Sequence, residues 1–329
     1  MLRRLIVLSP LLWAFAAFAG EVTDSTGRVV TVPDHIAHVA PAGPPAAILL
    51  EAIAPDLMIG WPGPLSDDAK ALLPDSANHP RIPRVTGRED VTDKIKALKP
   101  DLIVDYGEVT PRYFDLAQAT QQNTGVPTLL FAGSLDNIPR VVRQVGVILH
   151  REQRAETLAT YAEAMLALPV KPLPAAYGAH PKVLYARGAD GLLVTAPDTD
   201  VTEIFKRLGW RVVAPDGQGP FRTSSIEAIA ALDPDIVIFS DPAMRATMAR
   251  PDAWKPVRAV REGHVLVAPS QPFGWVEEPP SINRLLGLAW LGGHETQSLA
   301  ATFNAVVYGR ALTQPQLDAV LGGVHSPQP

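Results

Sequence analysis

The sequence predicts an α/β protein built as two lobes joined by a helical connector. Along most of the 329 residues, short unbroken apolar runs alternate with segments of helical spacing, a pattern typical of parallel sheets covered by helices on both faces. The segment LKPDLIVDYG at 98–107 returns as LDPDIVIFSD at 232–241, and a long helical pattern separates the two copies. Because a recurring unit marks duplicated substructures, we expect one sheet in each half.

Residues 1–19 have the pattern of a cleavable secretory signal peptide. Arg3 and Arg4 precede an apolar run, which ends at Ala17-Phe18-Ala19. The run is shorter than the roughly 20 residues that a membrane-spanning helix needs, so we expect no stable membrane insertion. The chain has no cysteine, which excludes disulfides, thiolate metal sites and a lipid-modified N-terminal cysteine. We therefore expect an exported, periplasmic protein without a lipid anchor.

The first lobe is expected over residues 20–150. Its strands are short and apolar, and proline, glycine or polar turns bound them. We predict strands at 29–32, 36–40, 57–60, 102–105 and 127–131, and helices at 46–53 and 93–98. Pro100 ends the second helix, because proline cannot continue the helical hydrogen-bond ladder.

The connector is expected over residues 151–175. Pro139 opens one helix, and a second helix over 151–167 would be about 25 Å long at the helical rise of about 1.5 Å per residue. That length suffices to reach from one lobe to the other. The second lobe, with terminal helices, is expected over 176–329, with strands at 183–185, 210–213, 236–239 and 265–267 and helices at 202–208 and 225–232.

Several classes of function have weak support in the residues. The formal charge of −5 gives no electrostatic reason to bind nucleic acid. We find no nucleophile elbow, phosphate-binding loop or His-Glu-x-x-His motif, so we expect no enzyme. Glu277 and Glu278 could mimic a catalytic pair, but adjacent side chains diverge. His35 and His38 have ligand-like spacing, yet at a strand they would point to opposite faces, so we predict no metal site.

The two Leu-x-Pro-Asp units and two C-terminal segments together resemble a known family. The segments are PFGWVEEPPSINRLLGL at 272–288 and the pattern Phe303…Tyr308-Gly309…Leu312-Thr313…Gln316-Leu317. Over about residues 21–321, the chain resembles the substrate-binding proteins of bacterial ABC importers for iron–siderophore complexes, cobalamin and haem. The resemblance implies two Rossmann-like lobes with parallel sheets, a single rigid connecting helix and a ligand cleft between the lobes. It also implies a monomer without a cofactor, which delivers its ligand to a permease dimer with ATPase subunits.

The expected ligand is a ferric siderophore or a related metal chelate. Haem and cobalamin, which other members of the family bind, are alternative ligands. The oxyanions molybdate and tungstate are a further alternative, because small-residue loops at helix N-termini bind oxyanions well. In parallel sheets, ligands sit outside the carboxyl ends of the strands. The loops there supply the predicted ligand-binding residues, which are Trp61, Arg88, Tyr106, Arg187, Arg222, Ser240, Phe273 and Trp275.

The three arginines are the predicted partners of an anionic chelate, and Trp61, Tyr106 and Trp275 its aromatic walls. Each arginine could equally be a solvated surface charge, and Trp275 could instead pack against the last helices. Asn283 and Arg284 are expected to cap and brace the following helix.

The resemblance also implies permease docking through one acidic residue on each lobe. Alignment on the repeat places these residues at Asp93 and Glu227. The family uses glutamate, so Asp93 departs from its pattern. Either acid could instead serve only as a favourable charge near a helix N-terminus.

Overall fold

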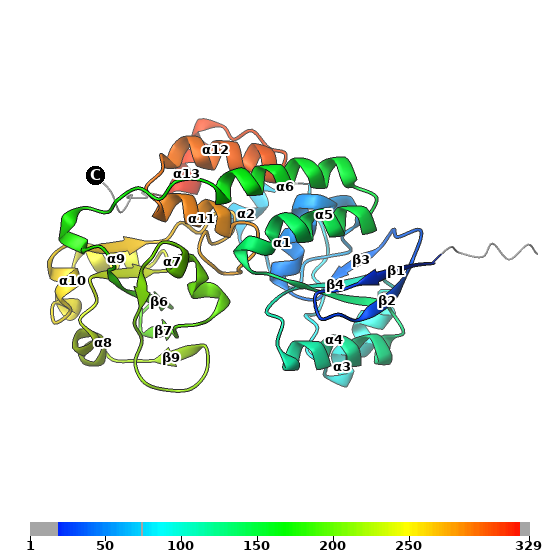
Figure 1. Ribbon diagram of the computed structural model, residues 1–329, viewed down its shortest axis with the longest axis horizontal. Helices are drawn as coiled ribbons and strands as arrows, with labels where there is room; N and C mark the ends of the chain where they lie inside the picture. Colours follow the sequence, from blue (N-terminus) through cyan, green and yellow to red (C-terminus); the bar gives the residue numbers. More distant parts are fainter. Residues whose placement is uncertain (1–18, 74, 323–329) are drawn as a thin grey trace, which may run out of the picture.

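The computed structural model describes residues 19–73 and 75–322. Two α/β lobes lie side by side, and the long helix α6 (Glu152–Leu166) runs along the upper side of the molecule between them (Figure 1). The predicted signal peptide falls outside the described residues, apart from Ala19. The two-lobe α/β fold with parallel sheets is confirmed.

The N-terminal lobe contains a three-stranded parallel sheet in the order β3 (Val39–Pro41), β4 (Leu102–Gly107), β5 (Thr128–Ala132). An antiparallel hairpin of β1 (Ala19–Thr23) and β2 (Val29–Pro33) precedes it. The strand expected at 57–60 is reduced to one bridge between Val39 and Met58, because the preceding residues form a 3-10 turn. The helices are α1 (Pro44–Ile53), α2 (Asp67–Leu72), α3 (Glu89–Ala97) and α4 (Pro111–Thr124).

The C-terminal lobe contains a mixed sheet. Its strands are β6 (Lys182–Arg187), β7 (Leu193–Thr195), β8 (Arg211–Val212), β9 (Phe221–Thr223), β10 (Ile236–Phe239) and β11 (Val265–Val267). Along β11-β10-β6-β8 the pairing is parallel, whereas β7 and β9 add an antiparallel edge that the sequence did not predict. The helices are α7 (Glu203–Arg207), α8 (Ile226–Leu232), α9 (Met244–Ala249) and α10 (Arg258–Arg261).

The repeated segment supplies an interior strand of each sheet, paired on both sides. β4 lies between β3 and β5, and β10 lies between β11 and β6. The aspartate of each Leu-x-Pro-Asp unit also has the same role. Asp101 accepts hydrogen bonds from the backbone N–H groups of Ala37 and His38, both at 2.8 Å, and Asp235 accepts one from Lys182 at 2.7 Å. Each aspartate therefore links the start of a neighbouring strand, β3 or β6, to the start of the repeated strand, β4 or β10.

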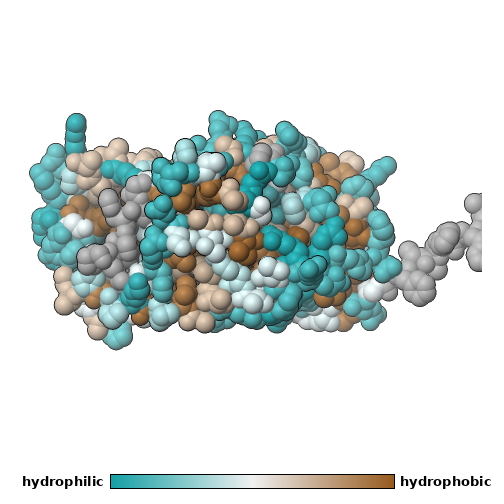
Figure 2. Space-filling model, turned by 90° about the horizontal axis from the view of Figure 1, so that it is seen from above, coloured by the Kyte–Doolittle hydropathy of each residue, from teal (hydrophilic) through white to brown (hydrophobic). Residues whose placement is uncertain are grey.

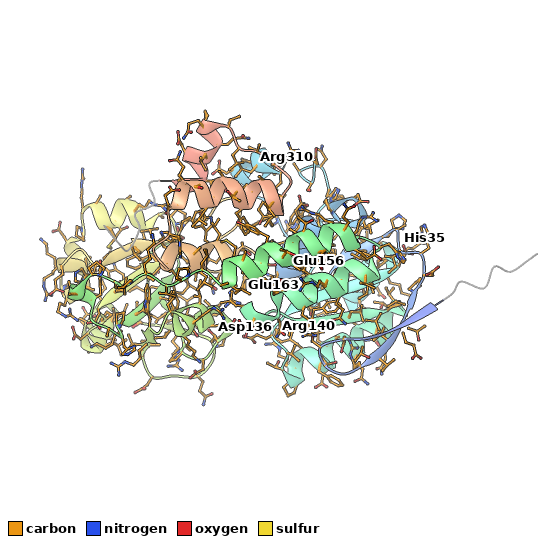
Figure 3. The ribbon with its side chains drawn as sticks, turned by 45° about the horizontal axis from the view of Figure 1, so that its top comes forward. His35, Asp136, Arg140, Glu156, Glu163 and Arg310 are labelled. Atoms are coloured by element: carbon orange, nitrogen blue, oxygen red, sulfur yellow. The ribbon has the colours of Figure 1, made fainter. Side chains whose placement is uncertain are left out.

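Helix α6 corresponds to the helix predicted over 151–167, and α5 (Ile138–Ile148), which packs against it, to the helix that Pro139 was predicted to open. The inner face of α6 is buried and apolar, with Leu158 and Ala162 fully covered. On the outer face, Glu156 and Glu163 pair with Arg143 of α5 at 2.7 and 2.5 Å (Figure 3). These pairs are exposed and screened by solvent, so the apolar face accounts for most of the stability of the helix pair.

Three terminal helices, α11 (Arg284–Leu291), α12 (Thr296–Val307) and α13 (Gln314–Leu321), pack over the connector. Arg154 of α6 fastens them to the first lobe by donating to the backbone carbonyls of Ala52, Val306 and Val307 at 2.7–2.9 Å. Seen from above, apolar residues on this side form scattered groups rather than one continuous band (Figure 2). Over the described residues, no helix combines the length and apolar character needed to cross a membrane.

Candidate ligand pocket between the lobes

A pocket of about 320 Å³ lies where loops of the two lobes meet. The N-terminal lobe contributes Pro44, Ile48, residues 61–66 and Ala69, and the C-terminal lobe contributes residues 270–273, Glu278 and Pro279. Pro44 follows β3 and residues 270–273 follow β11, so this part of the pocket lies at the carboxyl ends of parallel strands, where ligands bind in such sheets. Residues 61–66 come from the loop after α1 and the 3-10 turn at Pro55–Leu57. Its volume is at the lower end of the range for small-molecule sites, about 300–1,000 Å³.

One aromatic ring from each lobe forms the wall of the pocket. The ring centroids of Trp61 and Phe273 are 5.8 Å apart, and both side chains are more than nine-tenths buried. The indole Nε1 of Trp61 donates to the carbonyl of Ser76 at 3.0 Å, and the hydroxyl of Ser76 donates to the buried carboxylate of Glu51. The indole of Trp61 is therefore held in place from behind, and the exposed edges of the two rings give the pocket an apolar wall.

The polar end of the pocket is built around Glu278. Its carboxylate accepts hydrogen bonds from Ser240 Oγ at 3.2 Å and Arg187 Nε at 3.1 Å. The same Arg187 nitrogen lies 2.7 Å from the carboxylate of Glu277, which is buried behind the pocket. Burial raises the pKa of Glu277 to about 7, although Arg187 opposes the shift. The guanidinium of Arg187 also lies 4.1 Å from the ring centroid of Phe221, so its charge is covered on one side.

The structure divides the eight predicted ligand-binding residues into four groups of two. Trp61 and Phe273 line the pocket, and Ser240 and Arg187 support Glu278. Tyr106 and Trp275 are buried in the core; Trp275 is 1% exposed, packs edge-on against Trp290 and donates to the carbonyl of Gln271 at 3.2 Å. Of the two remaining arginines, Arg88 pairs with Asp90 in solvent, and Arg222 donates to the carbonyl of Pro215.

The structure therefore does not bring the three predicted arginines together at this pocket. Neither Arg88 nor Arg222 lines the pocket, and the charge of Arg187 is shared between two carboxylates. Two residues that the sequence did not single out for binding, Gln271 and Glu278, line it instead. Their position after β11 places them in a loop that the sequence predicts to be near the ligand, but only the fold shows which side chains of that loop line the pocket.

A second buried cluster fastens the lobes to each other. Arg284 is completely buried, donates to the carbonyl of Gly133 in the first lobe at 3.2 Å, and pairs with Glu203 in the second at 3.1 Å. Glu203 in turn accepts from the backbone N–H of Leu135 at 3.0 Å. Arg284 was expected to brace its own helix, and it bridges the lobes instead. Asn283 donates to the carbonyls of Gly274 and Pro279 and so shapes the loop that carries Glu278.

The two proposed docking acids are exposed on helices α3 and α8. Both helices lie toward the lower side of the molecule, opposite α6 (Figure 1). Glu227 is in the first turn of α8, but Asp93 is the fifth residue of α3, because this helix begins one turn earlier, at Glu89. The helix-dipole explanation therefore applies to Glu227 more than to Asp93.

The histidines that the structure describes form no metal centre. His35 lies at the outer end of the first lobe (Figure 3), and His38 lies 3.5 Å from Asp101. Across the part of the chain that the structure describes, no three histidine or carboxylate side chains form a group that could hold a metal ion.

Comparison with known proteins defines the class to which this arrangement belongs. A family model described as periplasmic binding protein matches residues 59–272. The chain therefore belongs to the periplasmic binding protein family, a family of binding proteins rather than enzymes. The family resemblance read from the sequence is confirmed. No curated protein sequence matches the chain.

Solved structures of this fold are similar over nearly the whole chain. An ABC transporter solute-binding protein from Sulfurospirillum deleyianum has a TM-score of 0.81 and 24% identity, covering 92% of this chain and 99% of that one. A molybdate-bound periplasmic binding protein from Haemophilus influenzae has a TM-score of 0.70 and 15% identity, with coverage of 89% and 99%. A protein of an Fe3+-hydroxamate transport system from Saccharomonospora viridis has a TM-score of 0.57 and 17% identity, with coverage of 82% and 97%.

Proposed function

We propose that the protein is the substrate-binding component of an ABC importer and captures a metal chelate, in the first instance a ferric siderophore. The observation that carries the proposal is the wall of Trp61 and Phe273, one ring from each lobe of a periplasmic binding protein. A ligand held there would contact both lobes at once. One similar structure comes from an Fe3+-hydroxamate transport system, which agrees with this ligand class.

An oxyanion is the main competing ligand, because one similar structure holds molybdate. The pocket is poorly suited to a tetrahedral anion. Among its described lining residues there is no lysine or arginine. Helix α1 begins at the pocket, but its first two residues are Pro44 and Pro45, which carry no N–H group. Two of the donors that a helix N-terminus normally offers to an anion are therefore missing.

The transport cycle that we propose has three steps. The exported monomer binds the chelate in the periplasm, the lobes close slightly, and the complex docks on the permease dimer through Asp93 and Glu227. Closure is small because Arg284 and Glu203 already fasten the lobes through buried contacts.

A thermal-shift panel tests the proposal. Purified protein is melted with ferric hydroxamates, haem, cobalamin, molybdate, tungstate and free metal ions. We expect a ferric chelate to raise the melting temperature, because a ligand that binds only the folded state stabilises it by mass action. The variant Trp61→Ala should lose most of this shift, whereas the surface variant Arg88→Ala should keep it. A shift with molybdate alone, or an unchanged shift in Trp61→Ala, would refute the proposal.

A further inference from the structure

The polar groups of the pocket are mainly hydrogen-bond acceptors. Glu278 is the one charged side chain among the described lining residues, and more than a third of it is exposed. Its backbone φ of 69° lies in the left-handed region, which non-glycine residues rarely adopt. Residues held in such conformations cluster at binding sites, because the surrounding structure must favour them. Here Ser240 and Arg187 hold the carboxylate in place.

Gln271 supplies a second acceptor whose orientation is determined by its neighbour. Its Nε2 donates to the carboxylate of Asp68 at 3.2 Å, and a carboxylate accepts only from the nitrogen side of the amide. The opposite atom, Oε1, is therefore the carbonyl oxygen. It is buried and has no hydrogen-bond partner. A buried acceptor without a partner is unfavourable, so a rotation of the Gln271 side chain that brings this atom to the pocket surface would let it accept from a donor on a ligand.

The charges around these acceptors sum to a negative value. Asp68 is exposed beside Gln271, Glu278 lines the pocket, and Glu277 is buried behind it. The single guanidinium in contact with them, that of Arg187, is shared between the two glutamates. The nearest cation on α2, Lys70, pairs with Asp67 at 2.8 Å.

We propose that the pocket selects a cationic ligand: a metal chelate that presents an ammonium or another N–H donor to Glu278 and to Gln271 Oε1. Glu278 is then the specificity-determining residue, and Asp68 adds a weaker long-range attraction. This inference rests on the proposed function, because it names the charge of the chelate bound at the same pocket.

A matched pair of ligands tests the inference. Ferrioxamine B is a ferric trihydroxamate with a pendant ammonium, and N-acetylation removes that charge without changing the iron centre. By titration calorimetry, we expect the wild-type protein to bind the ammonium form about tenfold more tightly, since charge-assisted hydrogen bonds are roughly twice as strong as neutral ones. The preference should fall at high ionic strength, because salt screens a partly exposed pair.

Three variants locate the effect. Glu278→Gln keeps an acceptor for Arg187 and Ser240, and it should reduce the preference to about one while the acetylated form binds as before. Asp68→Asn should reduce the preference partly. Asp67→Asn, the matched control, should leave it unchanged, because the Asp67 carboxylate pairs with Lys70 rather than with Gln271.

The outcomes separate the inference from the proposed function. Equal binding of both forms to the wild-type protein, or a preference that survives Glu278→Gln, overturns the inference and leaves chelate binding standing. If neither form binds and another compound of the thermal-shift panel does, the binding of that compound is compared between the wild-type protein and Glu278→Gln. The inference is overturned if that compound is an anion or if its affinity is unchanged in Glu278→Gln. It is supported if the compound is a cation that binds more weakly to Glu278→Gln. Failure of every compound overturns both.

Discussion

Replacing Arg284 by methionine tests whether the lobes are fastened through buried charges. The guanidinium is fully buried, donates to carbonyls of both lobes and pairs with Glu203. Breaking a buried pair by removing one partner costs about 3–5 kcal/mol. Glu203 would keep its bonds to the Leu135 N–H, so the cost should lie at the lower end, about 3 kcal/mol.

Urea unfolding, followed by tryptophan fluorescence, measures the loss. The matched control is Arg207→Met, which removes an exposed pair with Asp136 and should cost at most about 1 kcal/mol. Adding Glu203→Gln to Arg284→Met should recover part of the loss, because the double variant leaves no unpaired buried charge. A loss in Arg284→Met no larger than in the control would refute the account of the cluster.

Three other predictions follow from named contacts. Burial raises the pKa of Glu277 to about 7, so between pH 4.5 and 7 the folded protein holds a proton that the unfolded chain releases. Its free energy of unfolding should therefore fall by up to about 3 kcal/mol as the pH rises from 4.5 to 7. The variant Glu277→Gln should flatten this dependence, and a wild-type curve that is already flat in this range would contradict the prediction. Reversing Asp93 and Glu227 to lysine should spare ligand binding and abolish uptake in cells, whereas normal uptake would exclude the docking role. Glu51→Ala should weaken ligand binding about fivefold, because Ser76, which accepts from the Trp61 indole, loses its own hydrogen-bond partner; Glu51→Gln should not weaken it. In a Trp61→Phe background, Glu51→Ala should have no further effect, and an equal loss there would show that Glu51 acts elsewhere.

The sequence predicts well those elements whose apolar pattern matches their burial. β4 and β10 begin as apolar runs directly after Pro-Asp, and both are interior strands of their sheets. Helix α4 was missed because its buried face carries Thr120 and Thr124 rather than aliphatic residues. Their hydroxyls donate to carbonyls one turn earlier, at 2.7 and 2.6 Å, so they can be buried without producing an apolar period.

The site was predictable at the level of loops but not of side chains. Phe273 comes after β11, and Trp61 comes after the segment at 57–60 that was predicted as a strand; both line the pocket. The role of an arginine, in contrast, depends on which carboxylates or carbonyls the fold brings near it. Arg187 meets Glu277 and Glu278, 90 and 91 positions away, and no local pattern contains that information.

The location of iron in a crystal of the complex tests the central claim most directly. Crystals grown with a ferric chelate that shifts the melting temperature would be measured at the iron absorption edge. The account predicts one anomalous peak in the pocket beside Trp61 and Phe273, with Glu278 facing the chelate. A peak outside this pocket would contradict it.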